Sequence, residues 1–200
     1  MCIRSIFSLS LIISLLVVPR AFAQNTATTT SMGDFTTTID KDKNLHIVAA
    51  AQLTAPEAKV FDALSHPDLV AKSDPQVDKV QIISQDGNSR TIEVFGPQFA
   101  IPNAPESLKL KITTDARNQI VNVESCPGTP LQFKNQYKVS PSQDGQNTIV
   151  NYSSVSNDIG KQLGTDIPDE MRKEIGLQVF MHQMHRVGRY IDEHSNVANK

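Results

Sequence analysis

The sequence predicts an α+β fold in which one antiparallel β-sheet packs against a single long C-terminal helix. The helix is indicated by residues 167–194, where apolar residues recur at steps of three or four and so form one stripe. The sheet is indicated by several short segments of alternating polar and apolar residues, which are separated by turn-forming residues. The stripe consists of Leu177, Phe180, Met181, Met184, Val187, Gly188 and Ile191.

The first 23 residues have the pattern of a signal peptide. Arg4 supplies a positive charge, residues 6–18 form an apolar core, and residues 21–23 have the A-x-A pattern of a cleavage site. The apolar run is short for a transmembrane helix, and a retained membrane anchor is the alternative interpretation. Cys2 precedes the apolar core, which does not fit a lipoprotein anchor. We therefore expect export to the periplasm or the medium, with no stable membrane anchor after cleavage near Ala23.

Charge and cysteine usage limit the classes of partner. The 19 basic and 21 acidic residues give a net charge of −2, and cleavage would also remove Arg4 and Arg20. A mildly acidic domain lacks the basic surface expected of a protein that binds nucleic acid or anionic membranes. Cys126 would be the only remaining cysteine, so we expect no internal disulfide and a thiol that is buried or, alternatively, exposed and reactive. No cofactor is expected, and the sequence does not indicate an oligomeric state.

The mature chain has the length of one domain, and we place its folded part at residues 43–194. Residues 24–42 are rich in Thr, Ser, Asn and Asp and show little periodicity, so we expect a flexible lead-in. Phe35 and Ile39 are the residues of this lead-in that could pack against the domain. Residues 195–200 are expected to form a short tail.

Residues 44–53 predict the first strand, and two short helices follow it. Thr54 is positioned to cap the first of these helices, with Pro56 in its first turn. A His-Pro pair should end this helix, because the residue before a proline avoids the α region. Ser65 can then cap a second short helix at 67–71.

The middle of the chain predicts five or six strands joined by short turns. Residues 79–84 and 89–95 flank an Asp-Gly pair, which is a strong β-hairpin signal, and a second Asp-Gly pair lies at 144–145. Residues 96–105 contain three prolines and cannot form a central strand. We expect a loop there, whose Phe99 and Ile101 pack against the sheet or line a ligand entrance. The other predicted strands are 107–113, 119–125, 131–139 and 147–155.

Alternation within these strands predicts which side chains face the helix. Asn135 is the unusual member of this set, because a buried amide needs a hydrogen-bond partner. In one interpretation the partner is backbone, a tyrosine or water, and in the other the amide orients a bound ligand. The residues expected to point inward are Leu108, Leu110, Ile112, Leu131, Phe133, Asn135, Tyr137, Val139 and Tyr152.

Residues 53–67, LTAPEAKVFDALSHP, resemble the opening of the START-like superfamily. This group is also called SRPBCC, or the polyketide cyclase/dehydrase and lipid-transport group, and it includes Bet v 1-like proteins. Residues 77–80 with the following hairpin, and the amphipathic C-terminal helix, are similar to the same pattern. The resemblance implies a helix-grip fold, in which a curved antiparallel sheet of six to seven strands wraps around the long helix. It also implies a cavity between sheet and helix that accepts apolar ligands.

Aromatic and apolar residues of the strands and helices would line such a cavity, together with Asn135. We expect no catalytic residues and no metal site. His182 and His185 could serve a metal ion, but two histidines do not fill a tetrahedral site, and ordinary packed or exposed helix residues are the alternative. The expected ligand-binding residues are Phe61, Phe95, Phe99, Leu110, Ile112, Phe133, Asn135, Tyr137, Tyr152, Leu177, Phe180, Met181 and Met184.

The sequence therefore favours a binding module that carries a small hydrophobic ligand, such as a lipid, an isoprenoid or a polyketide-like molecule. The alternative is a cavity enzyme of the cyclase, dehydratase or hydrolase type. The inward strand positions offer such an enzyme no His, Asp or Glu apart from Glu93 and Glu124. The third interpretation is an interaction module without a ligand, which a large exposed apolar patch would favour.

Overall fold

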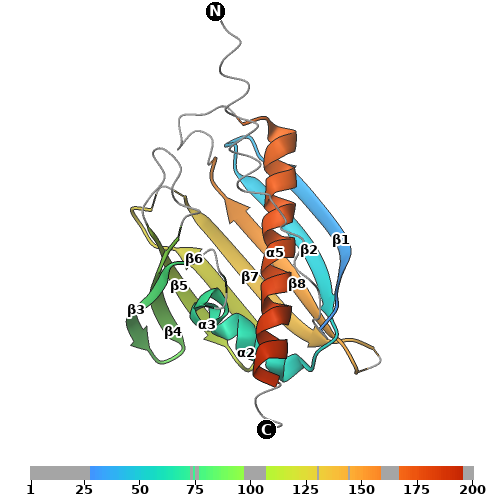
Figure 1. Cartoon of the computed structure of the whole chain (residues 1–200). Coiled ribbons are helices and arrows are strands. Elements are labelled where there is room, and N and C mark those ends of the chain that lie inside the picture. The colour runs from blue at the N-terminus through green and yellow to red at the C-terminus, as the bar shows by residue number, and fades with distance from the viewer. Residues whose placement is uncertain are drawn as a thin grey trace, which may run out of the picture.

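The computed structural model shows one antiparallel β-sheet, two short helices and one long C-terminal helix (Figure 1). It describes residues 28–72, 74, 77–96, 107–129, 131–143, 145–158 and 167–195. The elements in chain order are β1 (Thr30–Ile39), β2 (Leu45–Leu53), α2 (Glu57–Ser65), α3 (Pro67–Lys72), β3 (Lys79–Asp86), β4 (Ser89–Phe95), β5 (Ser107–Asp115), β6 (Ile120–Ser125), β7 (Phe133–Pro141), β8 (Thr148–Ser156) and α5 (Asp169–Ser195).

The described strands form a single eight-stranded sheet in the order β1-β2-β8-β7-β6-β5-β4-β3. Neighbouring strands are antiparallel throughout. The sheet bends around α5, which runs along its concave side and contacts β1 and β2 (Figure 1). Helices α2 and α3 also contact α5 and cover part of the other half of the sheet. The expected architecture is confirmed, with eight strands in place of the six to seven expected.

Strand β2 illustrates how one face of the sheet becomes the core. Its buried and exposed residues alternate, because successive side chains of a strand point to opposite faces. The buried face meets α5 at Gly176, where an added Cβ would lie 2.6 Å from Ile47 Cδ1 and 2.9 Å from Leu45 Cδ2. The glycine therefore lets the helix backbone approach the sheet without a side chain between them.

The predicted apolar stripe of α5 matches most of the buried face of this helix. Leu177 and Met181, both in its N-terminal half, are only half-buried. The stripe did not include Tyr190, which is 7% exposed and belongs to the core. The buried members of the stripe are Phe180, Met184, Val187, Gly188 and Ile191.

Residues 30–39 form strand β1, so the expected flexible lead-in over residues 24–42 is wrong for this part of the chain. β1 pairs with β2 along its length, from Thr30 opposite Leu53 to Ile39 opposite Leu45. Threonine is β-branched and suits strands, so a Thr-rich segment can pair with a neighbour even where it lacks apolar periodicity. This additional strand accounts for the higher strand count.

Neither of the two predicted helix caps is present. Helix α2 begins after Pro56 with no side-chain cap, and the hydroxyl of Thr54 instead accepts a hydrogen bond from the Thr29 N–H at 2.7 Å. The hydroxyl of Ser65 is buried and has no hydrogen-bond partner. Local spacing predicted a cap for both side chains, whereas long-range pairing with the segment before β1 takes up Thr54.

Both predicted Asp-Gly hairpin turns have the backbone conformation that glycine favours. Gly87 joins β3 to β4 with φ 53°, and Gly145 lies between β7 and β8 with φ 66°.

Cys126 is half-buried in the break after β6. Among the described residues, no helix combines the length and apolar character needed to cross a membrane. The expected signal peptide, the loop residues Phe99 and Ile101, and residues 196–200 of the tail lie outside the described residues.

Candidate functional site

The concave face of the sheet brings together most of the residues that were predicted to bind a ligand. Strand register aligns Ile112 of β5, Asn135 of β7 and Ser154 of β8 in one row across the sheet. The adjacent row contains Tyr137 and Tyr152, which lie directly opposite one another on β7 and β8. Both rows face α5 because their residues alternate with exposed residues on the same strands.

Three aromatic rings occupy the middle of the interface between sheet and helix. The rings of Tyr137 and Tyr152 have centroids 5.1 Å apart, and Phe180 of α5 stacks on Tyr152 at 4.5 Å with an interplanar angle of 14°. Phe180 and the neighbouring Met184 are both fully buried. At this level the protein's own side chains fill the space between the two layers.

The two tyrosines of this stack are uncharged at physiological pH. Burial, followed by the nearby Tyr152, raises the pKa of Tyr137 well above its usual value of 10. Burial likewise raises the pKa of Tyr152 to about 12. The Tyr137 hydroxyl donates to Gln183 Oε1 of α5 at 2.7 Å, which links the sheet to the helix. These phenols therefore serve as hydrogen-bonding groups and not as bases.

Asn135 interacts with the Tyr137 hydroxyl, as one interpretation of the sequence expected, and it also has a partner that neither interpretation named. Asn135 is only 8% exposed, and its Oδ1 accepts a hydrogen bond from the Ser154 hydroxyl at 2.7 Å. In the next row toward the strand ends, the Ser125 hydroxyl accepts from the Phe133 N–H at 2.9 Å. These groups add uncharged donors and acceptors to an otherwise apolar face.

Beyond the row of Asn135, Leu45 of β2 and Ile92 of β4 are buried, but four apolar side chains of the central strands and of α5 are only half-buried. This group consists of Leu110 and Phe133 from the sheet and Leu177 and Met181 from the N-terminal half of α5. Helix α2 contacts β5, β6 and β7 and lies beside the turn between β5 and β6, at the opposite end of these strands. The half-buried group therefore marks the end of the concave face that α2 does not cover; we call it the open end.

A charged cluster joins the segment after α3 to α5. Asp74 is 6% exposed, and its Oδ2 lies 3.0 Å from Arg186 Nε and 3.6 Å from His182 Nε2. The Arg186 contact is an ion pair without the alignment of a hydrogen bond. Burial lowers the pKa of Arg186, and the Asp74 carboxylate opposes this effect. The charges of this cluster compensate one another, as buried charges must.

Comparison of the whole chain with solved structures identifies this arrangement. No family model and no curated protein matches the sequence. The structure is similar to the Zhui aromatase/cyclase of Streptomyces sp. R1128, with a TM-score of 0.54 and 13% identity over 78% of this chain and 96% of that chain. It is also similar to a protein of Thermus thermophilus, with a TM-score of 0.53 and 11% identity over 78% and 99% of the two chains. The chain has the helix-grip fold.

A third helix-grip structure is the di-domain ARO/CYC BexL of the BE-7585A biosynthetic pathway. Its TM-score is 0.55, with 12% identity over 78% of this chain and 51% of that longer chain. The START-like resemblance of residues 53–67 is thus confirmed at the level of the fold. Sequence identities this low establish a shared architecture and leave the ligand to be argued from the residues of this chain.

Two of the predicted ligand-binding residues lie away from the helix-grip interface. Phe95 alternates with Val94 on β4 and therefore points to the other face of the sheet, where Lys79 Nζ lies 5.5 Å from its ring centroid. Phe61 of α2 packs against the core and also lines a depression outside the interface. Phe99 lies outside the described residues.

The acidic residues considered for an enzyme do not point toward α5. Glu93 accepts a hydrogen bond from the Ser107 hydroxyl, and Glu124 lies 3.9 Å from Lys111 and from Lys134 on the convex face. The described residues contain no group of three or more His, Cys, Asp or Glu side chains placed to hold a metal ion. Burial, with a smaller effect of His182, lowers the pKa of His185.

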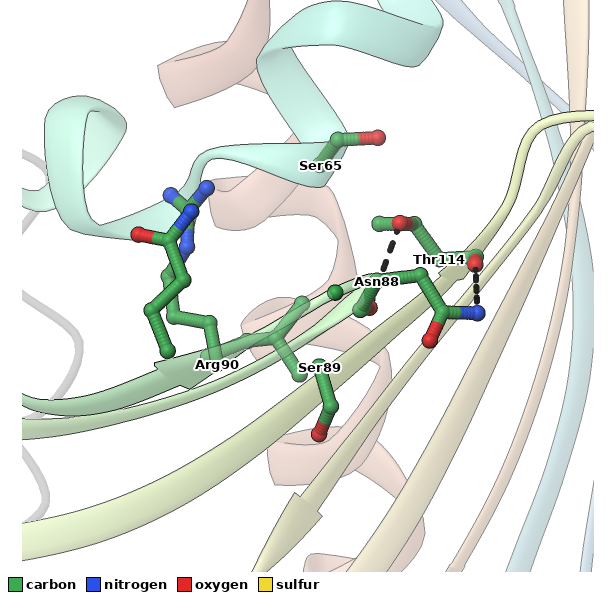
Figure 2. Close-up of a pocket in the computed structure, with 8 residues that line it drawn as sticks. Ser65, Asn88, Ser89, Arg90 and Thr114 are labelled. Atoms are coloured by element: carbon green, nitrogen blue, oxygen red, sulfur yellow. Dashed lines mark hydrogen bonds between the residues drawn. The ribbon is translucent and has the colours of Figure 1, made fainter.

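Sequence reasoning missed a polar recess where α2 meets the β3–β4 hairpin (Figure 2). The recess has a volume of about 40 Å³ and is lined by Ile112 and by mostly polar residues, which include Ser65, Ser89 and Arg90. Asn88 and Thr114 lie across the recess from Ser65, and the Asn88 amide donates to the Thr114 carbonyl at 2.8 Å (Figure 2). An open groove of about 630 Å³ lies beside it along α2. The sequence of the β3–β4 turn is short and polar, as is common for surface turns, so it did not indicate a binding site.

Proposed function

We propose that this helix-grip domain binds a small, uncharged and largely apolar molecule at the open end of its concave face. The observation that carries the proposal is the group of half-buried apolar side chains, Leu110, Phe133, Leu177 and Met181, next to the buried Asn135–Ser154 pair. Apolar walls with a few fixed polar groups are typical of small-molecule sites. Burial of the ligand would supply most of the affinity, at about 25 cal/mol per Å² of apolar surface.

The residues at the open end favour a ligand without charge. Their polar groups are an amide and hydroxyls, and the charges nearby on α5 are compensated within the cluster of Asp74, His182 and Arg186. The stacked rings of Tyr137, Tyr152 and Phe180 are buried behind the Asn135–Ser154 row and limit the depth of the site. A shallow site with an amide and hydroxyl groups favours a compact ligand with hydroxyl or carbonyl groups over a long-chain lipid.

The similar structures support the same class of ligand. Two of them are named as an aromatase/cyclase and an ARO/CYC, so polyketide-type molecules are the substrates to test first. A cavity enzyme is the second candidate function, because those names describe enzymes and because Tyr137 and Arg186 interact electrostatically near the site. We rank binding first, since Tyr137 is protonated and Arg186 is engaged by Asp74.

A titration with 2-naphthol tests the binding proposal, because this probe is aromatic and uncharged and has one hydroxyl group. Backbone amide NMR shifts should change at Leu110, Phe133 and Met181. Met181→Glu should weaken binding at least tenfold, because it places a charge on the apolar wall. Val179→Glu is the matched control on α5, since Val179 is 49% exposed, and it should leave the affinity within twofold.

Equal effects of the two glutamate variants, or NMR shifts by 2-naphthol that are confined to other parts of the chain, would rule out this site.

We also propose that the domain acts after export, in the periplasm or outside the cell, because residues 1–23 have the pattern of a signal peptide. N-terminal sequencing of the protein from its own compartment should then begin at Gln24, whereas an intact Met1 would contradict export by cleavage.

A further inference from the structure

A second candidate site lies outside the helix-grip interface, between α2 and the turns that follow β3 and β5. The polar recess and the open groove share two lining residues, Ser65 and Thr114, so they lie side by side, and we refer to the two together as the depression. The groove has an apolar part made by Ala58, Phe61 and Ala116. The groove has a volume of about 630 Å³ and is open to solvent.

The hydroxyl of Ser65 is the feature that points to a ligand. Ser65 is 8% exposed, and its Oγ is buried without a hydrogen-bond partner. In Figure 2 this side chain lies across the recess from Asn88 and Thr114, and no hydrogen bond reaches it. A buried hydroxyl without a partner costs about 1–3 kcal/mol, so a group that entered the recess and bonded to it would recover this cost.

The charged side chain of the recess is already paired, since Arg90 Nη1 lies 2.6 Å from the buried Asp68 carboxylate. An ionic group in the recess would have to break this pair, whereas a neutral group would not. In the groove, His66 Nδ1 lies 3.3 Å from Asp62 Oδ1, and Glu57 is a further lining residue. The recess has a volume of about 40 Å³, and a group of the size of water needs roughly 10–15 Å³ of such space. The recess therefore has room for a hydroxyl group.

We propose that this depression binds a small uncharged molecule with an apolar body and one terminal hydroxyl group. The hydroxyl enters the recess and hydrogen-bonds to Ser65, while the apolar body lies in the groove against Phe61, Ala58 and Ala116. The site is distinct from the open end, because Leu110, Phe133, Leu177 and Met181 do not line it, although Ile112 of the recess lies only one row from Leu110.

NMR titrations with benzyl alcohol and toluene test this site, since the two probes differ in the hydroxyl-bearing group and share the aromatic ring. Benzyl alcohol should shift the backbone amides of Phe61, Ser65 and Thr114 and should bind at least fivefold more tightly than toluene. Ser65→Ala should weaken the binding of benzyl alcohol about five- to tenfold, as the loss of one hydrogen bond predicts, and leave that of toluene unchanged.

A second pair of variants keeps the test valid if Ser65→Ala does not fold. Ala58→Gln places a longer side chain in the groove from an exposed helix position and should weaken both probes, whereas its exposed neighbour Lys59→Gln should not. Met181→Glu at the open end should leave benzyl alcohol binding at this site unchanged. The proposal is overturned if neither probe shifts the groove, if the shifts appear only at the open end, or if Ser65→Ala preserves the preference for the alcohol.

Discussion

Individual polar residues on the concave face are held by partners that are distant in sequence. Ser154 donates to Asn135 across two neighbouring strands, and Tyr137 donates to Gln183 of α5. Each of these contacts satisfies a group that burial would otherwise leave without a partner. The pair formed by Asn135 and Ser154 thus has a structural role that does not depend on a ligand, and it is available as a polar contact at the edge of the open end.

Removing both members of this pair should destabilise the fold less than the two single removals added together. Ser154→Ala should lower the free energy of unfolding by about 1–3 kcal/mol, because the amide of Asn135 stays buried without its donor. The double variant Ser154→Ala with Asn135→Leu should cost less than the sum of the single variants, since neither polar group remains. Urea denaturation of the four proteins gives these differences.

Ser153→Ala is the matched control for this cycle, because Ser153 is the exposed neighbour on β8. Its free energy of unfolding should stay within about 0.5 kcal/mol of the original protein. If Ser154→Ala has no larger effect than Ser153→Ala, the hydrogen bond to Asn135 does not contribute to stability.

At the scale of elements, the turn between β1 and β2 shows how a strand that was not predicted is held in place. Asp40 follows β1, and its carboxylate accepts hydrogen bonds from the backbone N–H groups of Asp42 and Asn44 and from the Asn44 amide. Its Oδ2 also lies 2.9 Å from His46 Nε2 at the start of β2. The turn is closed by Lys43, which adopts a positive φ of 64°.

The Asp40 network should make the stability of this turn depend on pH. The hydrogen bonds from His46 and Asn44 hold the pKa of Asp40 far below its ordinary value of 3.8. Because the folded state favours the ionised form, the contribution is complete above pH 3.8 and is lost as the pH falls toward the lower folded-state pKa. Asp40→Asn should therefore reduce stability at pH 6 and should converge with the original protein in strong acid.

Thermal unfolding of both proteins from about pH 2 to about pH 7 measures this convergence. Asp42→Asn is the control, since Asp42 contributes its backbone N–H to Asp40 and its side chain is in an exposed residue. A constant difference between Asp40→Asn and the original protein across this range would show that the carboxylate does not act through its ionisation.

The elements that the sequence predicted correctly have signals that are local. The Asp-Gly pairs predicted two hairpins, and the spacing of Phe180, Met184 and Val187 predicted the buried face of α5. Strand β1 was missed because its pairing with β2 supplies the stability that its own sequence does not indicate. The serine partner of Asn135 was missed for the same reason, since Ser154 lies 19 residues away and only strand register brings them together.

At the scale of the whole molecule, Arg172 connects three segments at the N-terminal end of α5. The residue is 3% exposed, and its Nη2 donates to the Lys43 carbonyl in the β1–β2 turn at 2.6 Å. Its Nη1 lies 3.7 Å from Asp158, which follows β8, and 3.6 Å from Asp169 in the first turn of α5. The half of α5 that carries Leu177 and Met181 is therefore anchored by a buried guanidinium group, whereas the C-terminal half is held by apolar packing, by the Asp74–Arg186 ion pair and by hydrogen bonds from Thr28 to Asp192.

Arg172→Met should loosen the N-terminal half of α5 and leave the C-terminal half in place. The loss of the hydrogen bond to Lys43 and of the two carboxylate contacts should lower the free energy of unfolding by about 2–4 kcal/mol. The rate of hydrogen exchange should increase more for the amides of residues 173–181 than for those of residues 184–191, because apolar packing around Met184 and Val187 remains.

Lys173→Met is the control, since the ion pair of Lys173 with Glu170 is at the surface, and it should change stability by less than about 0.5 kcal/mol. Weaker binding of 2-naphthol by Arg172→Met would connect this anchor to the open end, because Leu177 and Met181 would lose their fixed positions. A uniform increase in exchange along α5 would instead show that the helix responds as one rigid unit.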